Sequence, residues 1–215
     1  MAISAAVPAD MAAIAALAPV IPVLTIDKVS DAVPLARALM KGGLRVLEIT
    51  LRTDTALDSL AAIARDVPEA VVGAGTVLDE TQLRQAQHAG ARFGVSPGCT
   101  RALASATRAA NFPFLPGVQT VSEAMELSEL GFRLLKFFPA EQAGGIGWLK
   151  AVGAPLAGLR FCPTGGVNAE TAPAYLALPN VACVGGSWVA PRKAVEGGDW
   201  AVIEKLAAAA AKLRG

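Results

Sequence analysis

Short apolar runs alternate with amphipathic segments along most of the chain. The runs begin about 20 to 26 residues apart, and the segments between them, such as 31–40, 55–65 and 80–88, carry apolar residues at helical spacing. Continuous apolar runs are typical of parallel strands that are buried on both faces. We therefore predict eight strands: VIPVLTI from Val20, LRVLEITL from Leu44, AVVGAGTV from Ala70, RFGVSPG from Arg92, FPFLPGV from Phe112, LLKFFPA from Leu134, LRFCPTGGV from Leu159 and VACVGGSW from Val181.

Strands that alternate with helices in this way predict an α/β fold with a parallel sheet. Eight such units in about 200 residues predict one (β/α)8 TIM barrel domain over residues 1–215. A doubly wound open sheet is the alternative, but the chain lacks the G-x-G-x-x-G fingerprint after its first strand. Residues 11–17 predict an extra N-terminal helix, and residues 200–213 predict the last outer helix. Helix starts are expected at Ser30 and Asp31, Asp54, Asp79, Thr100 and Ser122, and helix ends at Gly42 and Gly43, Gly90 and Gly131.

The charge balance argues against two classes of partner. The formal net charge is +1, and lysine and arginine are scattered, so we expect no nucleic-acid partner and no membrane partner. The uncharged stretch from Met11 to Ile26 contains Pro19 and Pro22 and is too short to span a bilayer. No lysine or arginine precedes Lys28, so the positive segment of a secretory signal is missing. We expect a cytoplasmic protein.

Cysteine and histidine usage predicts neither a metal site nor a cofactor. Cys99, Cys162 and Cys183 form no Cys-x-x-Cys pair, which argues against a disulfide framework and against a zinc site. His88 is the only histidine and lies in a polar helical segment, which excludes a histidine-rich metal site. A carboxylate-held ion remains open.

Lys136 is the first candidate for chemistry, because it lies inside the apolar run LLKFFPA. A lysine is rarely buried without a partner or a purpose, and burial disfavours its charged form. A neutral amine is the nucleophile that forms a Schiff base with a ketone or an aldehyde. The alternatives are a lysine that extends to water at the strand end, or one that pairs with a buried glutamate.

Glu48 and Arg52 are four residues apart in LEITLR, so on an extended strand both project to the same side. At 3.3 Å per residue, Arg52 would lie about 13 Å closer to the carboxyl end, where TIM-barrel active sites are found. A lysine and a glutamate inside such a barrel form either a buried ion pair or an amine nucleophile with its proton shuttle. The planar guanidinium of Arg52 suits a substrate carboxylate.

Glycine-rich loops follow the last two predicted strands, as Pro163-Thr164-Gly165-Gly166 and Gly185-Gly186-Ser187. These loops are the customary phosphate site of a TIM barrel, because glycine lets backbone N–H groups close around an anion. Three further strand ends carry candidates for the pocket. We expect Thr76 to hydrogen-bond the substrate, Pro97 to shape the pocket wall and Phe138 to form an apolar wall beside Lys136, with ordinary loop structure and core packing as the alternatives.

Six motifs are spread through the predicted strands: LRVLEITLR, VGAGTVL, SPG, LKFFPAE, RFCPTGG and GGSW. Together they resemble the family of 2-keto-3-deoxy-6-phosphogluconate (KDPG) aldolases over nearly the whole chain. The resemblance implies a class I lyase of the Entner–Doudoroff pathway that releases pyruvate and glyceraldehyde 3-phosphate from a phosphorylated keto-deoxy sugar acid. It also implies a homotrimer. Relatives also cleave 4-hydroxy-2-oxoglutarate, and some prefer the galactonate epimer.

The resemblance also assigns roles to the candidates. It makes Lys136 the Schiff-base lysine and Glu48 the general acid/base. Arg52 would hold the carboxylate of the pyruvate end, with Thr76 and Pro97 lining that pocket and Phe138 packing against the substrate. The sugar chain and its phosphate would be bound by Thr164, Gly165, Gly166, Gly185, Gly186 and Ser187. The chain departs from the family pattern at two positions: Cys99, where an aliphatic residue is expected, and Gln119.

Three rival functions remain open from the sequence. A metal-dependent pyruvate aldolase on the same fold would polarise the ketone with a bound cation. A phosphate-binding decarboxylase of the orotidine or ketogulonate type would require Asp-x-Lys-x-x-Asp, whereas Lys136 lies between Leu134 and Pro139. A non-catalytic phosphosugar-binding protein would tolerate Lys136→Met with its binding intact.

Overall fold

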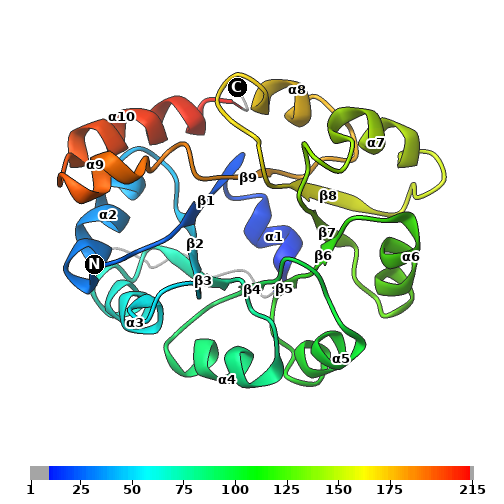
Figure 1. The fold of residues 1–215 in the computed structure, drawn as a ribbon, viewed down its shortest axis with the longest axis horizontal. Coiled ribbons are helices and arrows are strands. Elements are labelled where there is room, and N and C mark those ends of the chain that lie inside the picture. Colours follow the sequence, from blue (N-terminus) through cyan, green and yellow to red (C-terminus); the bar gives the residue numbers. More distant parts are fainter. Residues whose placement is uncertain (1–9, 214–215) are drawn as a thin grey trace.

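The computed structural model describes residues 10–213, so the first nine and last two residues of the expected domain lie outside the described part. It is an α/β fold, and Figure 1 shows helices surrounding the strands, with α1 over their centre. The strands are β1 Val20–Leu24, β2 Val46–Thr50, β3 Val71–Gly75, β4 Gly94–Val95, β5 Phe114–Leu115, β6 Gly117–Val118, β7 Leu134–Phe137, β8 Arg160–Pro163 and β9 Val184–Gly186. The helices are α1 Met11–Ala15, α2 Val29–Lys41, α3 Ala56–Asp66, α4 Glu80–His88, α5 Arg101–Ala109, α6 Val121–Glu129, α7 Gly145–Val152, α8 Ala172–Leu176, α9 Arg192–Glu196 and α10 Trp200–Ala211.

Paired strands run parallel throughout the described part, as the alternation of strands and helices predicts. One sheet has six strands in the order β5-β4-β3-β2-β1-β9, and a second has three in the order β6-β7-β8. Two isolated parallel bridges, Phe161 with Val181 and Thr164 with Gly185, link β8 to the β9 segment. Strands that follow one another along the chain are therefore neighbours in space.

The prediction of eight strands is wrong in one place. The fifth predicted run forms two strands, β5 and β6, which are separated by Pro116. Proline has no N–H to donate to a ladder, so it interrupts regular pairing. Its carbonyl still accepts a 2.8 Å hydrogen bond from the Lys136 N–H, which ties β7 to this break.

Helix starts agree with the sequence only in part. Asp79 and Thr100 cap α4 and α5 with their side chains, as predicted. The other predicted starts are wrong, because Ser30, Asp31 and Ser122 lie in the first turns of their helices and Asp54 precedes its cap by one residue. The residues at these N-terminal caps are Lys28, Thr55 and Thr120, and Thr120 forms a capping box with Glu123. Within residues 10–213, no helix is long and apolar enough to cross a membrane.

Buried apolar side chains form two clusters, and the smaller one occupies the space between the strands and α1. It includes Ile14 of α1 together with Val46 of β2 and Leu134 of β7. Because side chains alternate along a strand, Glu48 and Lys136, two residues further on, face the same side as Val46 and Leu134. The fold therefore directs both ionisable groups into the interior.

Candidate functional site

Lys136 and Glu48 form an ion pair inside the protein. Their strands, β7 and β2, are not paired with each other, yet Lys136 Nζ lies 3.3 Å from Glu48 Oε1, and both side chains are 3% exposed. Lys136 Nζ also lies 5.3 Å from the centroid of the Phe138 ring, within the range of a cation–π contact. Removing both charged groups from water costs free energy of folding. Buried ionisable pairs of this kind are common at active sites, so we interpret this pair as a candidate for chemistry.

Two glycines make room around this pair. A Cβ added to Gly75 of β3 would overlap the carboxylate of Glu48, and one added to Gly117 of β6 would overlap the carbonyl of Pro97. Gly117 is the register partner of Lys136, so the turn at Pro97 comes close to the lysine strand. Both glycines were missed by the sequence reasoning, although glycine inside a strand often marks close approach of another group.

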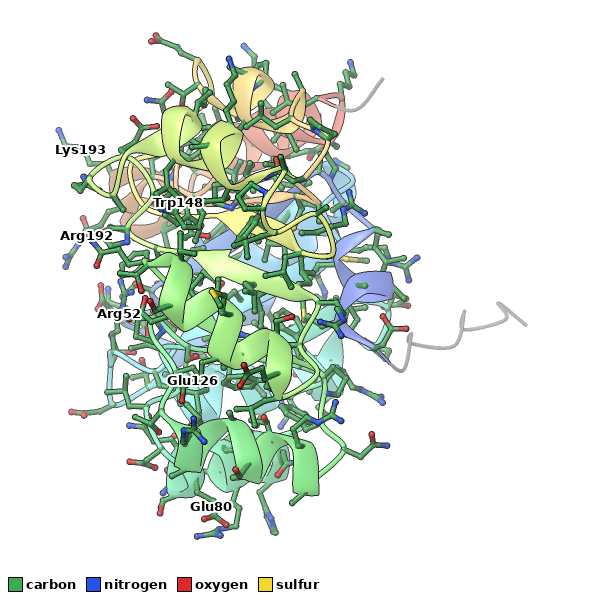
Figure 2. All side chains as sticks on the ribbon, turned by 90° about the vertical axis from the view of Figure 1, so that its right-hand side faces the viewer. Arg52, Glu80, Glu126, Trp148, Arg192 and Lys193 are labelled. Carbon is green, nitrogen blue, oxygen red and sulfur yellow. The ribbon has the colours of Figure 1, made fainter. Side chains whose placement is uncertain are left out.

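Arg52 does not continue β2, contrary to the expectation of one extended strand. The strand ends at Thr50, and the Arg52 N–H donates to the Thr50 carbonyl at 2.8 Å, which turns the chain. Arg52 Nε then donates to Thr76 Oγ1 at 3.0 Å, so the two predicted pocket residues meet through this turn. Figure 2 shows Arg52 on the same side of the molecule as Arg192 and Lys193 and opposite α1.

Thr76 has an unusual backbone. Its φ of 59° lies in the left-handed region, which is uncommon for a β-branched residue. Such conformations cost of order 1–3 kcal/mol and cluster at functional sites.

The turn that carries Arg52 is held from the other side, since the hydroxyls of Thr53 and Thr55 both donate to the Ile26 carbonyl, at 2.7 Å and 2.6 Å.

The loops after β8 and β9 lie side by side, as the sequence predicts for the ends of neighbouring parallel strands. Thr164 is buried and forms an isolated β-bridge with Gly185. A Cβ added to Gly185 would overlap the hydroxyl of Thr164. Gly165 and Gly166 have φ values of 99° and 83°, which favour glycine. Gly186 accommodates the ring of Trp188, a contact that sequence reasoning missed, and Ser187 is exposed. A cavity of about 810 Å³ is lined by Ser187 and Trp188 together with residues that include Val23 and Thr25 of the β1 end.

The structure thus brings the predicted residues together in two groups. The first group surrounds the interior ion pair and consists of Lys136, Glu48, Phe138 and Pro97. The second group lies at the carboxyl ends of the strands and consists of Arg52, Thr76 and the two glycine loops. Among residues 10–213, no group of three or more His, Cys, Asp or Glu side chains is arranged to hold a metal ion.

The family model and the curated relatives identify one family. The family model "KDPG and KHG aldolase" matches residues 11–206. The chain is 51% identical to 2-dehydro-3-deoxy-phosphogluconate aldolase of Pseudoalteromonas atlantica and 50% identical to the KHG/KDPG aldolase of Escherichia coli, over 88% of this chain and 88% and 89% of the respective relatives. Among solved structures, KDPG aldolase of Legionella pneumophila, with pyruvate captured as a covalent carbinolamine, superposes with a TM-score of 0.92 at 46% identity, covering 94% of this chain and 98% of that one.

Proposed function

The chain belongs to the KDPG and KHG aldolase family, and we propose that it is a class I aldolase that cleaves KDPG into pyruvate and glyceraldehyde 3-phosphate. The observation that carries this proposal is the buried contact of 3.3 Å between Lys136 Nζ and Glu48 Oε1. An amine beside a carboxylate in a dry interior supplies both a nucleophile and a proton shuttle.

The reaction begins when Lys136 passes a proton to Glu48 and its free amine attacks the C2 ketone of the substrate. Loss of water gives an iminium ion, which is an electron sink for the bond between C3 and C4. Glu48, directly or through a water, takes the proton of the C4 hydroxyl, and the electrons of the C3–C4 bond move into an enamine as glyceraldehyde 3-phosphate leaves. The same carboxyl group returns a proton to C3, and hydrolysis of the iminium releases pyruvate and the free lysine.

The other candidates bind and orient the substrate in this proposal. Arg52, held by its hydrogen bond to Thr76, pairs with the carboxylate of the pyruvate end, because a guanidinium matches the geometry of a carboxylate. Pro97 and Phe138 form the walls of that pocket. The phosphate end lies on the loops after β8 and β9, where backbone N–H groups bind the anion. These residues are Thr164, Gly165, Gly166, Gly185, Gly186 and Ser187.

We also infer the full architecture and assembly from the family resemblance. The two sheets, joined by the bridges between β8 and β9 and by the continuity of β5 and β6 along the chain, form one closed (β/α)8 barrel domain with α1 as an extra helix. The chain assembles as a homotrimer and acts in the cytoplasm in the Entner–Doudoroff pathway. Light scattering in solution tests the assembly, because a trimer has three times the 21.9 kDa mass of one chain.

Borohydride trapping tests the chemistry. The protein is incubated with pyruvate and reduced, and the adduct is mapped by mass spectrometry. A single reduced pyruvyl adduct on Lys136, absent from Lys136→Met, is the expected result. Absence of any adduct, under conditions that trap a known class I aldolase, contradicts the Schiff-base mechanism and favours a metal-dependent aldolase. Loss of turnover with a chelator would then support that rival.

Cleavage of 4-hydroxy-2-oxoglutarate is a second activity of the same site. A relative at 50% identity carries both activities in its name, KHG/KDPG aldolase. The smaller substrate presents the same pyruvate end to Lys136 and Arg52 but no phosphate. We expect turnover of both substrates, with a lower kcat/KM for the unphosphorylated one. Testing the gluconate and galactonate epimers in parallel determines which configuration at C4 is preferred, and we expect the gluconate type.

A further inference from the structure

The loop after β7 lies directly against the glycine loop after β8. The Ala140 N–H donates to the Thr164 carbonyl at 2.8 Å, and the Glu141 N–H donates to the Gly165 carbonyl at 3.1 Å. The helices that follow these loops, α7 and α8, are neighbours in Figure 1, and a Cβ on Gly145 of α7 would lie 3.0 Å from the Tyr175 hydroxyl of α8. Backbone hydrogen bonds therefore hold the two loops together.

The stem of Glu141 covers Gly166. A Cβ added to Gly166 would lie 2.5 Å from Cγ and 2.7 Å from Cβ of Glu141, closer than real Cβ atoms approach. The glycine is thus required by the glutamate as well as by its own φ of 83°. A carboxylate in this place is unexpected, because the neighbouring loop is the proposed site for a phosphate, and two anions repel each other.

Tyr175 controls the direction of that carboxylate. Its side chain is fully buried, and its hydroxyl donates a 2.6 Å hydrogen bond to Glu141 Oε1. Burial and the Glu141 carboxylate both raise the pKa of Tyr175, so the phenol stays protonated and remains a donor throughout the neutral range. The contact is charge-assisted, which makes it stronger than a bond between neutral groups.

We propose that Tyr175 and Glu141 are positioning residues for the phosphate end of the substrate, with the tyrosine holding the carboxylate away from the N–H groups of Gly165 and Gly166. The inference rests on the proposed function, since it concerns the same site. Without the phenol, the carboxylate of Glu141 is free to turn toward the loop. There it repels the phosphate and competes with it for the same donors.

The test compares one phosphorylated and one unphosphorylated substrate. Tyr175→Phe is expected to raise KM for KDPG about 10- to 100-fold, the effect of roughly one charge-assisted hydrogen bond. Its KM for 4-hydroxy-2-oxoglutarate and its borohydride trapping with pyruvate stay at the wild-type level. Glu141→Asp retains the charge but is too short to reach Tyr175, and it should show the same selective rise. The matched control is Glu170→Gln, which removes an exposed carboxylate from the turn between the glycine loop and α8. It should leave both KM values unchanged.

The double variant separates this role from a merely structural one. Tyr175→Phe/Glu141→Gln has neither the phenol nor the charge, so its KM for KDPG should return to within about threefold of wild type. A double variant no better than Tyr175→Phe overturns the proposal. Equal rises in KM for both substrates in Tyr175→Phe and in Glu141→Asp also overturn it. Failure of wild-type trapping at Lys136 is a different outcome, which overturns the proposed function itself.

Discussion

Gly75 of β3 faces Glu48 of β2 so closely that a Cβ at position 75 would overlap the glutamate carboxylate. The absence of a side chain at Gly75 is therefore what allows Oε1 of Glu48 to lie 3.3 Å from Lys136 Nζ. A residue outside the reaction thus determines where the proposed proton shuttle stands.

Gly75→Ala is expected to lower kcat about a hundredfold, because a displacement of about 1 Å in a catalytic group has an effect of that size. The adduct with pyruvate should still form on Lys136, but more slowly. Steady-state kinetics and borohydride trapping measure the two effects. Gly147→Ala, in α7 with open space around its Cβ position, is the matched control and keeps full activity. Unchanged kcat in Gly75→Ala would show that Glu48 tolerates another position.

The ion pair between Lys136 and Glu48 makes folding sensitive to either partner. Lys136→Met leaves a buried carboxylate without its cation, and we expect a loss of about 3–5 kcal/mol in the free energy of unfolding. Lys136→Met/Glu48→Met, which replaces both charges by apolar groups, should recover most of that loss while remaining inactive. Urea denaturation of the two variants and wild type gives the comparison. A double variant that is less stable than Lys136→Met contradicts this account.

The sequence was sufficient for the strands other than the fifth predicted run, which Pro116 divides, and for the side of the strands on which the interior pair lies, because both follow from local rules. Apolar runs mark buried strands, and the two-residue alternation places Glu48 and Lys136 on the same face as Val46 and Leu134. The same rule gave a wrong result for Arg52, since β2 ends at Thr50 and tertiary contacts turn the chain. No local pattern contains the bond from Arg52 to Thr76, or the one from Tyr175 to Glu141, because each joins residues far apart in the sequence.

Thr76 combines backbone strain with a functional hydrogen bond. Its φ of 59° favours glycine, so Thr76→Gly should raise the free energy of unfolding by up to about 1 kcal/mol. The same change removes the acceptor of the 3.0 Å bond from Arg52 Nε, and kcat/KM should fall about tenfold. Thr76→Ser retains the hydroxyl and serves as the activity control. Denaturation and kinetics on the same preparations test the trade-off, and a Thr76→Gly variant with full activity would show that the bond does not orient Arg52.

Cys99 should be an unreactive thiol although it is partly exposed. Burial raises its pKa to about 11, against contributions from Ser96 and from the Ala104 backbone that act in the opposite direction. Only the thiolate is nucleophilic, so two pKa units above the ordinary 9.0 predict alkylation about a hundredfold slower than that of a free thiol at neutral pH. Mass spectrometry after timed iodoacetamide treatment measures the rate, with urea-unfolded protein as reference. Equal rates in folded and unfolded protein would contradict the prediction.

Tyr175 is the only tyrosine of the chain, so the ultraviolet absorbance of the phenolate reports on this residue alone. Burial, followed by the hydrogen bond and charge of Glu141, raises its pKa, and the ionisation midpoint should lie well above the ordinary value of about 10.

The direction of the shift sets its effect on stability. The folded pKa lies above the unfolded one, so the contribution of this group is fully present below about pH 10 and is lost as the pH rises through the folded pKa. Glu141→Gln removes the carboxylate but not the burial. Its midpoint should therefore fall between that of wild type and that of the urea-unfolded chain. An identical midpoint in wild type and Glu141→Gln would mean that the two side chains are not coupled in solution, and the proposed positioning of the phosphate loop would lose its physical basis.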